Sequence, residues 1–217
     1  MNDEYSLTYA KYSIFPSRRY SYQLRLKLIK NLLIKNNCKS VLDIGSATGD
    51  YAIDLKKENF NVVSIDINIY SLVTARNKDS NLSVVGANIY SLPFKDGSFD
   101  ALIIMNAFRY FEDPSRSIQE SNRVLRNNGH LILIDHNRYC PDTLLINKDV
   151  IKYYSVREFR DLIENNGFKI AYETMLFIPP PFLSSFIINS ILNIRSILDI
   201  LIKYIYPEIF IGAIKVK

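Results

Sequence analysis

The chain has 217 residues, a formal net charge of +5, 48% hydrophobic residues and 23% charged residues. This balance is typical of one globular domain, and the dispersed basic residues do not form the stripe that favours nucleic acid as a partner. Cys38 and Cys140 lie far apart and form no C-x-x-C pair. The sequence therefore predicts no disulfide framework, no metal site and a reducing, cytoplasmic setting. The acidic and aromatic start has no apolar core, so we expect no secretory signal.

The first segment is rich in tyrosine and carries the pair Arg18–Arg19. Two interpretations stay open: a flap that closes over a ligand with aromatic faces, or a segment that packs on the domain. Pro16 is expected to break any helix in residues 1–20. From Ser21 to Asn36, leucines recur at helical spacing and predict a helix.

The stretch Val41 to Asp50 reads VLDIGSATGD and combines an apolar run, an acid and a glycine-containing turn. We expect a buried strand over 40–44 and a helix over 51–58. Gly45 and Gly49 can adopt a positive φ and let backbone N–H groups approach a ligand, while Ala47 stands where a third glycine is expected. The pattern favours a cofactor cradle, although two glycines also serve turn geometry alone.

A second buried strand, Asn61 to Asp66, ends in an acid 17 residues beyond Gly49. In doubly wound sheets an acid at this place accepts hydrogen bonds from ribose hydroxyls. The alternative is that Asp66 caps the N-terminus of the following helix, which is expected over 69–76.

The remaining elements alternate between strand and helix, which predicts an α/β fold around a parallel sheet. Asn106 follows the fourth strand at its carboxyl end, where ligands bind in such sheets. Ser155 and Glu158 form a capping box. The expected strands are 82–86, 99–105, 130–135, 168–177 and 209–216, and the expected helices are 114–125 and 155–166, with Asn127-Asn128-Gly129 ending the first of these.

Residues 182–206 are strongly apolar at helical spacing but carry several polar residues. They are too polar for a membrane span. Three interpretations stay open: a hydrophobic lid over an acceptor, a helix at a membrane interface, or a helix that packs against the sheet or a partner subunit.

Five stretches in order resemble class I S-adenosylmethionine-dependent methyltransferases, and more narrowly their type 11 group of quinone and lipid methylases. The stretches are VLDIGSATGD, VVSID, GANIYSLPFKDGSFDALIIMNAFRYFEDP, VLRNNGHLILID and YYSVREFRDLIENNGFKI. The resemblance implies a Rossmann-like seven-stranded sheet in the order 3-2-1-4-5-7-6, with the last strand antiparallel and helices on both faces. We expect one domain over 1–217, made of a flap and helix (1–36), a cofactor-binding core (37–178) and an apolar helix with the last strand (179–217).

The resemblance also assigns roles around S-adenosyl-L-methionine, whose product is S-adenosyl-L-homocysteine. The glycine turn would hold the methionine part with Asp43 at its amino group, Asp66 would bind the ribose, and Asn88 would face the adenine amino group, where the family often has Asp. The full set implied as cofactor-binding is Asp43, Gly45, Ser46, Ala47, Gly49, Asp66, Ile67, Asn88, Ile89 and Asn106.

The sulfonium already activates the methyl group, so a base is needed only where the acceptor loses a proton. His136, directly after the fifth strand, is the candidate base, and a surface loop histidine is the alternative. Arg109 and Tyr110 are candidate acceptor-site residues, whereas His130 is expected to be structural.

The sequence thus predicts methyl transfer to a small hydrophobic, lipid-like acceptor, with peripheral membrane contact or a homodimer through 182–206 left open. Asn106-Ala107-Phe108-Arg109 differs from Asn-Pro-Pro-Tyr, which argues against an adenine or glutamine amide as acceptor. A non-catalytic cofactor-binding module, an RNA or protein methyltransferase, and a nicotinamide oxidoreductase remain as alternatives.

Overall fold

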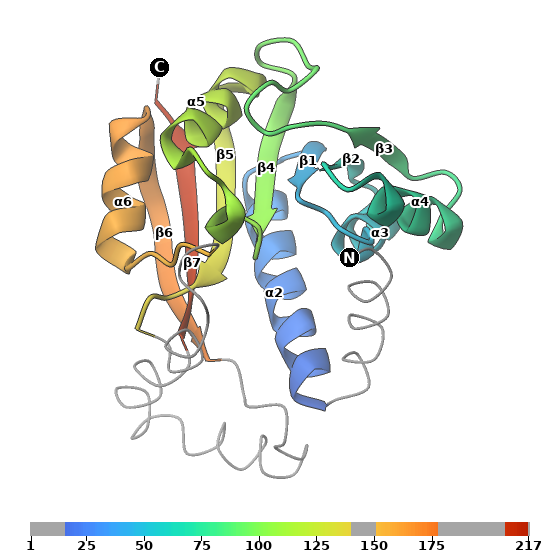
Figure 1. Cartoon of the computed structure of the whole chain (residues 1–217), viewed down its shortest axis with the longest axis horizontal. Coiled ribbons are helices and arrows are strands. Elements are labelled where there is room, and N and C mark those ends of the chain that lie inside the picture. The colour runs from blue at the N-terminus through green and yellow to red at the C-terminus, as the bar shows by residue number, and fades with distance from the viewer. Residues whose placement is uncertain (1–15, 140–150, 178–206, 217) are drawn as a thin grey trace.

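The computed structural model describes residues 16–139, 151–177 and 207–216, and these build one seven-stranded sheet flanked by helices (Figure 1). The strand order is β3-β2-β1-β4-β5-β7-β6, which confirms the predicted order. The strands are β1 (Ser40–Ile44), β2 (Asn61–Asp66), β3 (Ser83–Gly86), β4 (Phe99–Met105), β5 (Leu125–His136), β6 (Phe168–Phe177) and β7 (Pro207–Lys215).

Strands β1 to β5 pair in parallel, so their carboxyl ends meet at one edge of the sheet. β7 lies between β5 and β6 and is antiparallel to both, as predicted for the last strand. Because of this direction, the first residues of β7 lie at the edge where β5 ends, and Glu208 pairs with His136.

The helices cover both faces of the sheet and bury two separate cores. The described helices are α2 (Pro16–Lys35), α3 (Asp50–Lys57), α4 (Ile69–Lys78), α5 (Pro114–Val124) and α6 (Val156–Asn165), with a 3-10 turn η1 (Phe108–Tyr110). One core joins α5 and α6 to the sheet through Ile118, Phe159 and Ile163. The other joins α2 and α3 through Ile29 and Leu55. In Figure 1, α6 and α2 accordingly lie on opposite sides of the strands.

Two predictions about element boundaries are wrong. Pro16 does not break a helix but begins α2, because proline is tolerated in the first helical turn, where its missing N–H has no intrahelical acceptor. The fifth strand begins at Leu125 rather than His130. Leu125 pairs with Phe99 and His130 with Ala101, so the residues between them bulge out of the strand, with Asn128 at φ 61°.

For residues 1–20 a flap and a packed segment were left open, and residues 1–15 of that segment lie outside the described residues, as does the apolar helix over 182–206. Within the described part of the chain, no helix is long and apolar enough to cross a membrane.

Candidate functional site

The glycine turn after β1 is a compact bend anchored to the neighbouring strand. The backbone N–H groups of Gly45 and Ser46 both donate to the carbonyl oxygen of Ile65, at 2.9 and 3.0 Å. Gly45 has φ 68° and Gly49 has φ 72°, a left-handed region that favours glycine. A Cβ on Gly45 would lie 2.5 Å from the Cβ of Ala107, so the turn approaches the residues that follow β4 closely.

Asp66 holds this turn from the end of β2. Its Oδ2 accepts a hydrogen bond from the N–H of Ala47 at 2.9 Å, and its Oδ1 accepts one from the N–H of Asn68 at 2.8 Å. The N-cap of α4 is Asn68, whose side chain accepts from Tyr70 and Ser71. The helix-capping alternative for Asp66 is therefore wrong, and its carboxylate lies beside the glycine turn.

Asp43 is a buried carboxyl group at the same edge. It is 3% exposed, and no hydrogen bond or ion pair of its side chain is found among the described residues. Burial, with the nearby charge of Asp66, raises the pKa of Asp43 to about 7. A carboxyl group in this state is poised to take a cationic partner, because a positive charge beside it would restore its ionised form.

The adenine side of the predicted site is built by the end of β3. The N–H of Ala87 donates to the carbonyl oxygen of Asp66 at 3.2 Å, which brings Asn88 next to Asp66 along the edge. The Oδ1 of Asn88 accepts a hydrogen bond from the N–H of Tyr90, so one of its two acceptor sites is already used. Ile89 is buried in the core, whereas Ile67 is 74% exposed.

Asn106 contacts a network of charged side chains next to the place predicted for the methionine part of the cofactor. It has φ 52°, and its N–H donates to the carbonyl oxygen of Ile134 at 2.7 Å. Its Oδ1 accepts from Arg109, which also forms an ion pair with buried Asp135 at 2.7 Å. Arg109 was predicted as an acceptor-site residue, but Asp135 was not, although it is the acid at the end of the run LILID.

His136 lies one residue further along β5, with its side chain 35% exposed. Its Nδ1 is 3.7 Å from Oε1 of fully buried Glu208, and Arg25 of α2 binds that carboxylate through two hydrogen bonds. Glu208 and Arg25 were not predicted from the sequence. His130 instead lies in the middle of β5, six residues before His136 and away from this edge, as expected.

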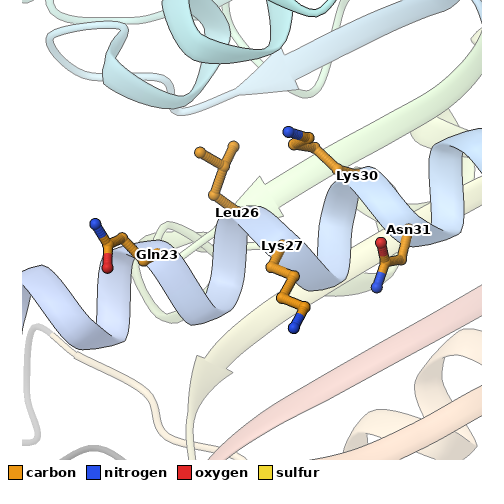
Figure 2. A pocket seen from close by; sticks show the side chains of 5 residues that line it. All are labelled: Gln23, Leu26, Lys27, Lys30 and Asn31. Carbon is orange, nitrogen blue, oxygen red and sulfur yellow. The ribbon is translucent and has the colours of Figure 1, made fainter.

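Two shallow hollows in the described part of the chain lie elsewhere. One runs along α2 and is lined by Gln23, Leu26, Lys27, Lys30 and Asn31 (Figure 2). The other lies between the end of α2 and strands β5 to β7, beside His130. Neither is lined by a predicted cofactor-binding residue. Those residues lie at and after the carboxyl ends of the strands.

The residues present fit the nucleoside and amino acid parts of S-adenosylmethionine. Asp43 offers a buried carboxyl group without a partner among the described residues, and the buried Oγ of Ser46 likewise has no hydrogen-bond partner. Asp66 keeps a free lone pair on each carboxylate oxygen for ribose hydroxyls. Ile67 presents an exposed apolar side chain beside it, suited to a base.

Comparison with known proteins finds a similar domain and a similar fold. Residues 42–133 match the family model described as a methyltransferase domain. A solved structure from Thermotoga maritima, described as a S-adenosylmethionine-dependent methyltransferase and possible histamine N-methyltransferase, superposes with a TM-score of 0.72 over 99% of this chain and 97% of that one, at 22% identity. Residues 42–133 are thus similar to a methyltransferase domain, and the fold is that of the solved methyltransferase structure.

Curated relatives come from quinone biosynthesis. A demethylmenaquinone methyltransferase of Thermotoga maritima is 31% identical over 50% of this chain and 48% of its own length. A ubiquinone/menaquinone biosynthesis C-methyltransferase of Wigglesworthia glossinidia brevipalpis is 27% identical over 73% of this chain and 72% of its own. The corresponding enzyme of Rickettsia typhi is 30% identical over 66% and 62%. The chain thus spans from about half to under three quarters of the length of these relatives.

Proposed function

We propose that the chain transfers a methyl group from S-adenosylmethionine to a small hydrophobic acceptor, such as an aromatic ring of quinol type. The observation that carries the proposal is the buried carboxyl group of Asp43 beside the glycine turn, with Asp66 on the next strand. The relatives' names support an acceptor of this chemical class.

In this proposal the protein binds and orients the cofactor and the acceptor, and it excludes water. Asp43 takes the amino group of the methionine part, Asp66 the ribose hydroxyls, and Asn88, Ile89 and Ile67 surround the base. When bound, the cofactor supplies an electrophilic methyl group on a sulfonium. Holding the acceptor's nucleophilic atom in line with that methyl group lowers the barrier through proximity and orientation.

The test begins with calorimetry of S-adenosylhomocysteine on the full chain, followed by transfer from labelled S-adenosylmethionine to a panel of hydroquinones, phenols and lipid extracts. We expect S-adenosylhomocysteine to bind and the labelled methyl group to appear in an organic-soluble product. The Asp43→Asn variant should bind S-adenosylhomocysteine about 10- to 100-fold more weakly and transfer less label, whereas the matched surface variant Asp161→Asn should behave like the wild type. Absence of S-adenosylhomocysteine binding would overturn the proposal.

The second candidate is a cofactor-binding module without transfer, which the exposed apolar surface of Ile67, Ile69 and Tyr70 beside the base site allows. It predicts normal binding of S-adenosylhomocysteine and no labelled product with any acceptor in the panel.

A further inference from the structure

The end of β5 carries a buried arrangement of charges that cofactor binding alone does not require. Glu208 is fully buried at the start of β7 and pairs in register with His136. Arg25 reaches it from α2, with its Nε 2.7 Å from Oε2 and its second nitrogen on Oε1. A bidentate pair of this kind fixes the carboxylate in position.

One ring nitrogen of the His136 imidazole lies beside this carboxylate, and the other has no partner among the described residues. Nδ1 is 3.7 Å from Oε1 of Glu208. No hydrogen bond of Nε2 is found among the described residues, and the side chain is 35% exposed. A carboxylate that faces one ring nitrogen favours the tautomer with its proton there, which leaves the lone pair on the other nitrogen.

The position of His136 places this lone pair at the edge where the cofactor residues meet. The N–H of Asn106 donates to Ile134, two residues before His136 in the same strand. Arg109 joins the Oδ1 of Asn106 to Asp135, the residue next to His136. The end of β5 that carries the imidazole is therefore hydrogen-bonded to the end of β4, and Ala107, just after β4, lies against the glycine turn.

Burial favours the neutral form of His136. Burial lowers its pKa, and the charge of Glu208 offsets this only in part. Asp135 acts in the same direction as Glu208, whereas Arg109 and Arg25 oppose it. Burial would raise the pKa of Glu208 itself, but the charges of Arg25 and Arg109 and the hydrogen bonds from Arg25 more than offset that and hold the pKa below its usual range. Glu208 thus stays ionised while His136 stays uncharged near neutral pH.

We propose that Arg25 and Glu208 are positioning residues that hold His136 as the Nδ1–H tautomer, so that Nε2 accepts the proton of the acceptor during methyl transfer. This inference rests on the proposed function and narrows its acceptor class. The acceptor's nucleophilic atom carries a removable proton, as in a phenol or an electron-rich ring carbon. That atom bonds to the methyl carbon as the S–CH3 bond breaks, and its proton passes to Nε2.

The decisive experiment needs no acceptor. The chain has only two histidines, so ¹⁵N-histidine labelling and long-range ¹H–¹⁵N spectra from pH 5 to 8.5 report both rings, and a His130→Gln variant assigns them. We expect His136 to be neutral at pH 7.5 with the Nδ1–H form in about tenfold excess. A dominant Nε2–H form would overturn the proposal.

The double variant Arg25→Met/Glu208→Leu tests whether this ion pair causes the Nδ1–H tautomer of His136 to predominate. It replaces the buried pair with apolar side chains of similar size and leaves no unpaired buried charge. We expect the Nδ1–H excess to disappear and the pKa of His136 to fall further. An unchanged tautomer in a folded variant would overturn the role of the pair. If that variant does not fold, the wild-type spectrum alone decides.

Activity separates the two proposals. If the wild type does not bind S-adenosylhomocysteine, the proposed function fails whatever the tautomer. If the wild type transfers methyl groups, His136→Gln should lower kcat about 100-fold and remove the acidic limb of its pH profile, with cofactor affinity unchanged. Transfer at the wild-type rate in His136→Gln would overturn the inference and leave the proposed function intact.

Discussion

At the scale of single residues, the site is defined by a buried carboxyl group that costs the fold stability. Asp43 lies on β1 between buried Leu42 and Ile44, and burial raises its pKa to about 7. Because the folded state binds this proton more tightly than the unfolded chain does, Asp43 lowers stability as the pH rises from about 4 to above 7. Binding a cationic amino group would repay that cost.

The Asp43→Asn variant should therefore be more stable and bind less well. At pH 8 we expect the free energy of unfolding to rise by about 2 kcal/mol, with little change at pH 4, and the affinity for S-adenosylhomocysteine to fall about 10- to 100-fold. Urea unfolding and calorimetry measure these effects, and Asp161→Asn is the exposed control. Equal destabilisation at both pH values would contradict this account of Asp43.

Ala47 holds a left-handed conformation, with φ 46°, at the position where a third glycine is expected. This conformation costs an L-residue about 1–2 kcal/mol. Glycine removes that cost but adds freedom to the unfolded chain. We expect Ala47→Gly to raise the free energy of unfolding by about 0.5 kcal/mol, measured in urea. The same change at Ala52, inside α3, should lower it by about 1 kcal/mol or more. A loss of stability in Ala47→Gly would contradict this reasoning.

At the scale of elements, the strand ends carry the site residues, and the helix caps fix where the neighbouring helices begin. The capping box predicted for α6 is confirmed: the N–H of Glu158 donates to the Oγ of Ser155, and the Glu158 carboxylate accepts from the N–H of Ser155. This cap fixes the start of α6 directly after Tyr154, which packs on Phe108 and Phe159 near the carboxyl edge.

Replacing Ser155 by alanine should destabilise the fold by about 1 kcal/mol, because the backbone N–H of Glu158 loses its acceptor. Thermal or urea unfolding measures the loss, and the exposed Ser80→Ala variant should lie within about 0.5 kcal/mol of wild type. If Ser155→Ala and Ser80→Ala behave alike, the cap is not contributing to stability.

Local patterns predicted most elements, because hydrophobic period and turn residues act over a few neighbours. Strands β1, β2, β4 and β6 have the predicted limits. The bulge in β5 was not predicted, since it depends on pairing with β4. Asp43 and Asp66 could be placed together because parallel strands end at one edge. Arg25 and Glu208 could not, because 183 residues separate them and neither follows a recognisable motif.

At the scale of the whole molecule, paired carboxylates should make the fold sensitive to acid. Burial alone would raise the pKa of several of them, but hydrogen bonds and ion pairs more than offset it and lower the pKa of Asp54, Asp79, Asp100, Glu120, Glu158 and Glu208. Their contribution is present above about pH 4.5 and is lost as the pH falls through the lowered values.

We therefore expect the free energy of unfolding to decline steeply between pH 4.5 and 3. Urea unfolding at pH 7, 5 and 3 measures this, and 0.5 M salt should weaken the part that comes from exposed pairs while leaving that of Arg25–Glu208. Stability that is constant down to pH 3 would contradict the assignment of these pairs as stabilising.

The place of β7 has a consequence for how the protein is made. A nascent chain emerges from the ribosome with its N-terminal part first. β6 is complete by residue 177, but its neighbour in the sheet is not complete until residue 215. Until then β6 has no strand to pair with. Glu208, whose carboxylate faces His136, is not yet part of the sheet. Translation that stalls before Glu208 would leave the nucleotide half of the sheet assembled and the other half open to aggregation and proteolysis.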